Sequence, residues 1–318
     1  MKTGYRIDGN ALVPCDGGDA SVLVYGELSD DERSELLRTY DIDPPDLDGV
    51  FDADEVPRVE FTPERTFIIW KRPDNATRDK TVQFEVSSFG LIYTESRVVV
   101  IVSRGTLPFS GKEFRKVGSN VDFLLRVMLS CVHHYQGHLK AIKLISQELQ
   151  AKLVTSMENL YLLQMFSLGE SLIYYHNAIE ANHAVLGKLR GAAERLKFSP
   201  EQIEMLDDVM IENQQAGKQA SIYSTVLSGL MDARGSIINN NMNVLLRNLT
   251  IINVVFLPLN LIASIGGMSE YSMMTRGADW RIAYLLFSFA MVVMGWGTWW
   301  WLKRTMLHEY GAGMKKGR

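Results

Sequence analysis

Three polar side chains interrupt a long apolar run near the C-terminal end of the chain. Asn253, Asn260 and Ser264 all lie within residues 249–265, which carry no charge. At about 100° of rotation per residue, they share one helical face with three neighbours. That face comprises Leu246, Thr250, Asn253, Leu257, Asn260 and Ser264. Because an unpaired amide is costly in hydrocarbon, we expect this face to contact protein or water rather than lipid.

Two kinds of chemistry are compatible with such a face. Its polar groups could form hydrogen bonds with a second membrane helix, although the next apolar run offers few partners beyond Tyr284, Ser288 and Thr298. Alternatively, several copies of the helix surround an axis and line a pore with rings of amide and hydroxyl oxygen. Magnesium gives up its bound water reluctantly, so neutral oxygens that hydrogen-bond its hydration shell suit a hydrated divalent ion.

The residues beside this face add to the pore hypothesis. Two leucines are candidates for hydrophobic constrictions: Leu257, which lies between Asn253 and Asn260, and Leu249, which comes earlier on the same predicted helix. Asparagines crowd positions 239–241 and 243, just before the apolar run. They either face the ion at the cytoplasmic mouth or form a polar helix surface.

Two segments are suited to crossing a bilayer. Residues 249–265 and 282–302 are uncharged and close to the roughly 20 residues that a helical span needs. The tail after 302 is rich in Lys and Arg, and the N-terminus lacks an apolar signal segment. We therefore expect a multi-pass membrane protein with both termini in the cytoplasm.

The first hundred residues alternate short β-branched or aromatic runs with turn residues. Runs at 22–25, 65–70, 80–86 and 91–103 are predicted to be strands. Between the first two, Ser29 or Asp30 is expected to cap a short helix. These patterns predict a mixed sheet with helices packed on it.

After Pro108 the strand-like runs stop and apolar residues recur at helical spacing. A clear helix start follows, with Ser199 as N-cap, Pro200 at the first helical position and Gln202 completing a capping box. The next proline is Pro258, so one helix of on the order of 100 Å is predicted from Pro200 into the membrane.

The predicted fold class is an α+β cytoplasmic domain followed by a very long stalk helix and a two-helix transmembrane region. The predicted domains are an α/β N-terminal cytoplasmic domain (1–116), a helical cytoplasmic hairpin region (117–198), a long stalk helix ending as the first span (199–265), an external loop (266–281), the second span (282–302) and a basic cytoplasmic tail (303–318).

Charge and motif content argue against several classes of protein. Residues 1–60 hold sixteen acidic and five basic side chains, which argues against nucleic-acid binding and favours a soluble or cation-attracting surface. Cys15 and Cys131 lie far apart without a CxxC motif. His134 and His138 have a metal-ligand spacing but no HExxH motif, so structural histidines and a cytosolic zinc site both remain open. We do not expect an enzyme.

The run NNNMNVLLRNLTIINVVFLPLNLIASIGGMS, with a short loop, a second span and a basic tail, resembles the CorA divalent-cation transporters. That family carries an LT...F.P...A.I.GMN pattern at the end of a long pore-lining helix, and LSGLMD and FDADEVPRVEF extend the similarity. The resemblance implies a funnel-shaped homopentamer in the lipid of a bacterial inner (plasma) membrane. The implied pore lining is Asn243, Leu246, Leu249, Thr250, Asn253, Leu257, Asn260 and Ser264. The implied outer-mouth signature is Gly267, Met268 and Ser269, and Asp208 matches an acidic residue of a regulatory cation site.

Ser269 stands where the family signature has Asn. In this divergence the chain resembles a CmaX-like branch of the family. The two glycines before it are expected to let the backbone turn tightly at the outer mouth. The predicted function is a metal cation channel or transporter with Mg²⁺, Zn²⁺, Co²⁺ or Ni²⁺ as substrate and no tightly bound cofactor. The alternative is a non-conducting pentameric scaffold or ion sensor of the same architecture.

Overall fold

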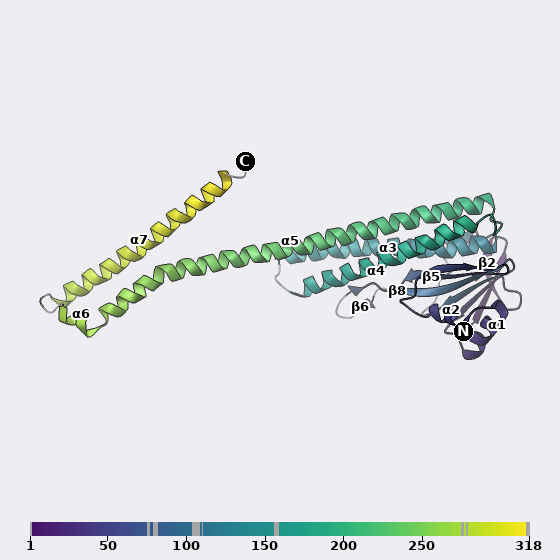
Figure 1. Cartoon of the computed structure of the whole chain (residues 1–318), viewed down its shortest axis with the longest axis horizontal. Coiled ribbons are helices and arrows are strands. Elements are labelled where there is room, and N and C mark those ends of the chain that lie inside the picture. Colours follow the sequence, from purple (N-terminus) through teal and green to yellow (C-terminus); the bar gives the residue numbers. More distant parts are fainter. Residues whose placement is uncertain are drawn as a thin grey trace. The chain divides into compact units, whose positions relative to one another are not determined.

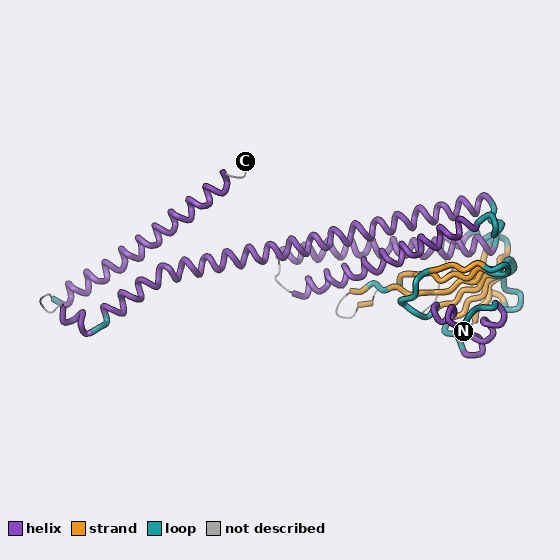
Figure 2. Tube along the Cα trace, in the orientation of Figure 1, coloured by secondary structure: helices purple, strands orange, loops and turns teal. Residues whose placement is uncertain are grey.

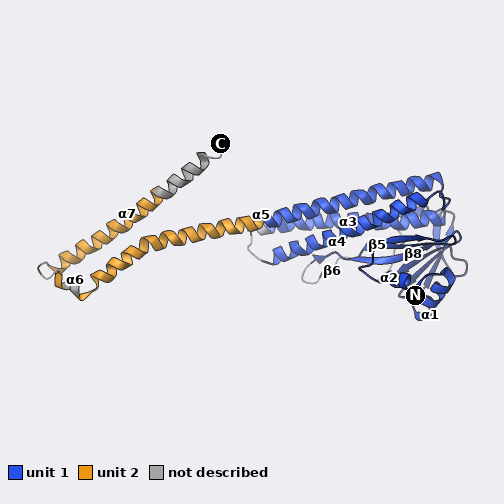
Figure 3. Ribbon diagram, in the orientation of Figure 1, with its two compact units in different colours: residues 1–232 blue, residues 233–318 orange. Residues whose placement is uncertain are grey.

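The computed structural model describes residues 2–74, 77–78, 82–103, 109, 111–155, 159–274, 277 and 279–315. Within it the chain divides into two compact units, Met1–Asp232 and Ala233–Arg318 (Figure 3). The boundary falls inside one long helix. The predicted domains 1–116 and 117–198 therefore belong to a single unit, together with the first half of the predicted stalk helix.

The first unit is built on a seven-stranded sheet with strand order β2-β1-β3-β9-β8-β5-β4. Figure 2 draws its strands in orange. Neighbouring strands are antiparallel except β3 and β9, which run parallel with Val22 opposite Val98. The strands are β1 (Lys2–Asp8), β2 (Ala11–Cys15), β3 (Val22–Gly26), β4 (Arg58–Phe61), β5 (Thr66–Pro73), β8 (Val86–Tyr93) and β9 (Val98–Val102), and a separate small sheet pairs β6 (Thr77–Arg78) with β7 (Val82–Gln83).

Both faces of the sheet are buried, which explains the continuous VVVIV sequence of β9. Side chains alternate along a strand, so Val98 and Val100 enter one core while Val99 and Ile101 enter the other. A strand covered on both faces reads as an unbroken apolar run rather than an alternating one.

Helices cover the two faces separately. α1 (Asp30–Tyr40) and α2 (Pro44–Gly49) lie on one face, and α3 (Asn120–Thr155), α4 (Asn159–Ala192) and the first part of α5 (Pro200–Gly266) lie on the other (Figure 1). A short 3-10 helix, η1 (Lys112–Arg115), precedes α3. The predicted α+β class with a very long helix is confirmed.

Local signals explain where the helices begin. Ser29 caps α1, and a capping box joins it to Glu32. Ser199 and Gln202 form the same reciprocal pair at the start of α5, through bonds of 2.9 and 3.3 Å. Both helix starts were predicted from the sequence.

One buried amide fastens the helical layer to the sheet. The side chain of Asn182, on α4, accepts a hydrogen bond from the Lys71 N–H at 3.0 Å and donates one to the Lys71 carbonyl at 2.8 Å. β4 pairs with β5 only as far as Ile69, so Asn182 supplies the partners that a neighbouring strand would otherwise give to Lys71.

Some strand predictions were wrong in detail. The predicted strand 91–103 is two strands, β8 and β9, joined by a turn in which Thr94 N–H donates to the Arg97 carbonyl at 2.9 Å. In the predicted strand 80–86, residues 80 and 81 lie outside the described part of the chain, and the remainder contains β7 and the first residue of β8. In the seven-stranded sheet, β1, β2 and β4 were missed, because none of them contains a long run of consecutive apolar residues.

The second unit contains the rest of α5, a short helix α6 (Ser269–Met274) and α7 (Trp280–Lys315). α5 and α7 each contain a stretch long and apolar enough to cross a membrane. The helix of α7 continues beyond the predicted span into the predicted tail 303–318. Residues 316–318 of that tail, including Lys316 and Arg318, lie outside the described residues.

Candidate functional site

All eight predicted pore-lining residues lie on α5 in the second unit, and all eight are exposed in the single chain. At about 100° per residue they fall within an arc of about 120°. We call this set the α5 stripe. It comprises Asn243, Leu246, Leu249, Thr250, Asn253, Leu257, Asn260 and Ser264.

Half-buried residues on the opposite side of α5 form a second face. Its α5 members are Ile251, Val255, Leu259, Ile262 and Gly266, and half-buried residues of α7 recur at the same spacing at Ala283, Phe287, Met291, Gly295, Thr298 and Leu302. We call these two sets the interhelix seam. On α5 the seam is centred about 180° from the α5 stripe, so the stripe faces away from the half-buried side of its helix.

Two close contacts join the helices along this seam. The ring of Phe287 lies against the main chain of Gly266, and a Leu259 methyl lies 3.4 Å from the position that a Cβ of Gly295 would occupy. On each helix, a glycine therefore leaves room for a large side chain of the other helix. The hydroxyl of Thr298 does not reach across, because it donates to carbonyls of its own helix, Met294 at 2.9 Å and Gly295 at 3.0 Å.

The two hydroxyls of the α5 stripe also bond within their helix. Thr250 Oγ1 donates to the Leu246 carbonyl at 2.9 Å, and Ser264 Oγ donates to the Asn260 carbonyl at 2.8 Å. Each hydroxyl proton is thereby used, while the oxygen keeps lone pairs that can accept. A stripe of such oxygens is suited to groups that donate, such as the water around a hydrated cation.

The turn after α5 differs from the expectation in one respect. Gly267 N–H donates to the Ala263 carbonyl at 3.1 Å and Met268 N–H to the Ile265 carbonyl at 3.1 Å, which caps the helix end. Neither Gly266 nor Gly267 has a positive φ. The expectation that glycine freedom permits a tight turn was therefore wrong: Gly266 is explained by the space that Phe287 fills.

Asp208 lies on α5 in the first unit, and its side chain is exposed. The adjacent Asp207 is held by Arg190, through bonds of 2.7 and 3.3 Å. Across the described residues of this chain, no three His, Cys, Asp or Glu side chains are close enough to hold a metal ion. A regulatory site at Asp208 would therefore need ligands from a second copy.

His134 and His138, whose spacing is compatible with a zinc site, contact each other and Tyr175. The rings of His134 and His138 are 4.4 Å apart, and His138 Nδ1 lies 2.6 Å from the Tyr175 hydroxyl. Burial, and secondarily the charge of His134, lowers the pKa of His138 to about 4. The pair belongs to no three-residue metal cluster in the described chain.

Sequence reasoning missed a histidine between two carboxylates. His133 on α3 lies 2.9 Å from Glu113 of η1 through Nδ1 and 2.8 Å from Glu212 of α5 through Nε2. Both ring nitrogens donate only when the imidazole is charged. The hydrogen bond from His133 lowers the pKa of Glu113. No sequence spacing could have indicated this contact, since its members come from three separate elements.

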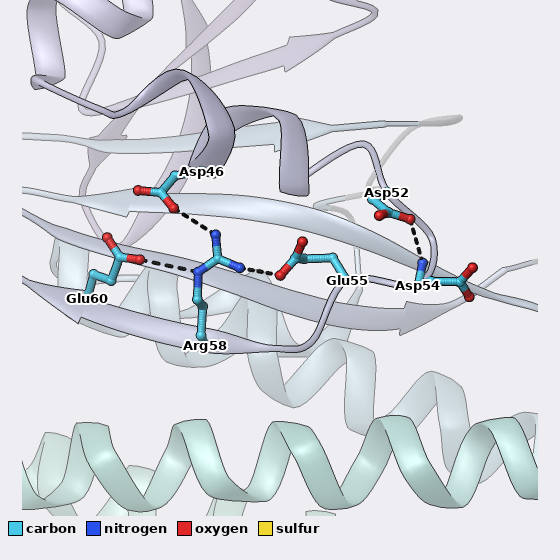
Figure 4. Close-up of polar contacts among 6 residues, drawn as sticks. All are labelled: Asp46, Asp52, Asp54, Glu55, Arg58 and Glu60. Carbon is cyan, nitrogen blue, oxygen red and sulfur yellow. Dashed lines mark hydrogen bonds and ion pairs between the residues drawn. The ribbon is translucent and has the colours of Figure 1, made fainter.

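In the acidic stretch FDADEVPRVEF, Arg58 forms ion pairs with carboxylates of the stretch and of α2. Arg58 contacts three carboxylates: Asp46 at 2.8 Å, Glu60 at 3.2 Å and Glu55 (Figure 4). Asp52 accepts a hydrogen bond from the Asp54 N–H at 2.9 Å. The Arg58 cluster joins α2, the following loop and β4, so this part of the acidic surface has a structural role.

Comparisons with known proteins agree with this architecture. The CorA-like Mg²⁺ transporter family matches residues 23–304. The cobalt/magnesium transport protein CorA of Methanocaldococcus jannaschii is 24% identical over 255 residues, which are 76% of this chain and 77% of the relative. The complete structure of the CorA magnesium transporter from that organism superposes with a TM-score of 0.72 at 20% identity, covering 95% of this chain and 96% of the other. The full-length CmaX structure gives the same TM-score and coverage at 13% identity.

An α/β unit, a helix continuing from it into an apolar region and a second apolar helix define a two-span membrane protein with an additional α/β domain. The match over residues 23–304 makes the assignment specific: the chain belongs to the CorA-like Mg²⁺ transporter family. Its members are membrane transporters of divalent cations rather than enzymes.

Proposed function

We propose that this chain forms a channel or transporter in which the α5 stripe lines the path of a divalent cation. One observation carries the proposal: the stripe is exposed, while the opposite face of α5 is half-buried and contacts α7 at Leu259 and Gly266. In a homo-oligomer, copies of α5 that turn their stripes inward would leave the α7 helices outside. We propose five copies, the number that the CorA resemblance implies.

The proposed path alternates polar and apolar rings. Asn253, Asn260 and Ser264 supply oxygens for the hydration shell of the ion, and Leu249 and Leu257 supply constrictions. A magnesium ion that keeps its first water shell avoids a large dehydration cost. A membrane potential of 100 mV supplies about 4.6 kcal/mol for two charges, so no nucleotide hydrolysis is needed.

The proposed orientation places both termini in the cytoplasm of a bacterial inner membrane. Lys303 and Arg304 follow the second apolar run, as the positive-inside bias requires. In this orientation residues 266–281 form the external loop, and the signature Gly267, Met268 and Ser269 lies at the outer mouth. Asp208 is assigned to a regulatory cation site between subunits, in agreement with its exposure.

The experiment that tests the function is cation flux into liposomes containing the purified full-length protein. We expect uptake of at least one of Mg²⁺, Zn²⁺, Co²⁺ and Ni²⁺, driven by an inside-negative potential. Measurements with and without a pH gradient separate potential-driven flow from proton coupling. Liposomes containing Asn260→Leu protein provide the control for leakage around an assembled oligomer.

A non-conducting scaffold or ion sensor is the second candidate, and one residue favours it. Ser269 replaces the amide of the family signature with a shorter hydroxyl, which lacks the NH2 group that can brace a neighbour. A protein that assembles normally and carries none of the four ions would support the scaffold and contradict the transporter.

A further inference from the structure

The end of the first apolar helix is held from the side by an aromatic ring of the second. Gly266 is the last residue of α5, and a Cβ placed on it would lie 2.5, 2.8 and 3.2 Å from three ring atoms of Phe287. Contacts below 3.0 Å do not occur for real Cβ atoms. Even a methyl group at position 266 would therefore require the ring or the helix end to move.

The absence of a side chain at Gly266 serves packing rather than backbone conformation. Its φ is not positive, so any residue could adopt this main-chain geometry. By contrast, a Cβ on the adjacent Gly267 would make only ordinary contacts, at 3.5 and 3.6 Å, with carbonyl oxygens of its own helix. The requirement for glycine is thus confined to the one position that touches the ring.

The contact sits directly beside the proposed outer mouth. Gly266 immediately precedes the turn in which Gly267 and Met268 cap the last carbonyls of α5, and Ser269 begins α6. Phe287 lies two helical turns into α7, on the half-buried seam. A displacement of the ring or of residue 266 is therefore transmitted to the turn through the main chain.

We propose that Phe287 is a positioning residue for cation entry, which sets the place of the Gly267–Met268–Ser269 turn by packing on Gly266. This inference rests on the proposed function. The ring touches no ion; it acts through the main chain of Gly266. Its effect belongs to the capture of the cation at the mouth rather than to the assembly of the oligomer.

The test is a double-mutant cycle in the full-length protein, in which the cation concentration for half-maximal flux is measured separately from the maximal flux. We expect Gly266→Ala to raise the cation concentration for half-maximal flux by about tenfold, because the methyl group displaces the turn. Phe287→Leu alone should also raise the half-maximal concentration, because the smaller side chain no longer fills the space at Gly266. Introduced into Gly266→Ala, Phe287→Leu makes room for the methyl group and keeps an apolar side chain against residue 266, so it should bring the half-maximal concentration back to within about threefold of the original.

Gly295→Ala is the matched control, since Gly295 lies on the same seam away from the mouth and would meet Leu259 only at 3.4 Å. It should leave the half-maximal concentration unchanged. An unchanged value in Gly266→Ala, an equal rise in Gly295→Ala, or a double variant no better than Gly266→Ala would each overturn the proposal.

Hydrogen exchange keeps the two proposals separable. In Gly266→Ala, the amides of Gly267 and Met268 should exchange faster, and the double variant should restore their protection, whether or not ions flow. If the unmodified protein carries no cation, the proposed function fails, while the exchange pattern still decides whether Phe287 holds the turn. Unaltered exchange in Gly266→Ala would contradict that role.

Discussion

The hydroxyl of Ser264 donates to the main-chain carbonyl of Asn260 at 2.8 Å, one turn earlier on the same exposed face of α5. The Ser264 proton is therefore used inside the helix, and its oxygen can only accept. The amide of Asn260 can both accept and donate. Among the outer polar groups of the α5 stripe, Asn260 is thus best equipped to interact with a hydrated ion and with a neighbouring copy.

Replacing Asn260 with Leu should reduce cation flux by at least about tenfold, because it removes a ring of amides from the path. The oligomer should remain intact, since the side chain is exposed and lies opposite the interhelix seam. Ser288→Leu is the matched control: Ser288 is exposed on α7 and lies off the seam. Equal flux in Asn260→Leu and the unmodified protein would show that Asn260 does not line the pore.

Replacing Ser269 with Asn restores the family signature at the proposed outer mouth. We expect a higher affinity for the transported cation, seen as a lower half-maximal concentration in liposome flux, because an amide adds donors to a longer side chain. Ser269→Ala should shift it in the opposite direction. If both variants match the original protein, position 269 does not contribute to cation capture.

Asn182 should be important for the stability of the first unit. Its replacement with Ala leaves the Lys71 N–H and carbonyl without their partners, at a cost of about 3 kcal/mol. The measurement is hydrogen exchange of β5 and α4 peptides in the full-length protein. Asn177→Ala, on the same helix, is the control. Protection equal to that of the unmodified protein would show that water replaces the amide without loss.

Acidification should weaken the packing around His138. Burial, then the charge of His134, lowers its pKa from an ordinary 6.5 to about 4, so the unfolded chain binds more protons between these values. Stability is therefore complete above about pH 6.5 and declines toward pH 4, by less than the full value of about 1.4 kcal/mol per pH unit, because the ring is partly exposed and solvent screens its charge. His138→Gln should flatten this decline in the exchange of α3 and α4 peptides. An identical pH profile would contradict the assignment.

Much of the architecture was predictable from local patterns. The capping boxes at Ser29 and Ser199 specify helix starts through side chains only three residues apart, and the absence of proline between Pro200 and Pro258 permits one long helix. The stripe was also predictable, because helical rotation alone brings Asn253 and Asn260 onto one face.

Contacts between distant segments were not predictable in this way. Phe287 and Gly266 belong to different helices, and a Gly-Gly pair in a sequence suggests a turn before it suggests room for an aromatic ring. The link from Asn182 to Lys71 spans 111 positions, and a lone asparagine inside a helix gives no sign of its partner. Only the packing of α4 on β5 brings them together.

The most direct test of the central claim is the water accessibility of single cysteines along α5, in a background lacking Cys15 and Cys131. Flux through Asn253→Cys, Leu257→Cys and Asn260→Cys should be blocked by a water-soluble thiol reagent. Flux through Val255→Cys and Leu259→Cys should be unaffected, since those residues lie on the seam. Block of the seam variants with no effect on the stripe variants would show that the opposite face of α5 lines the path.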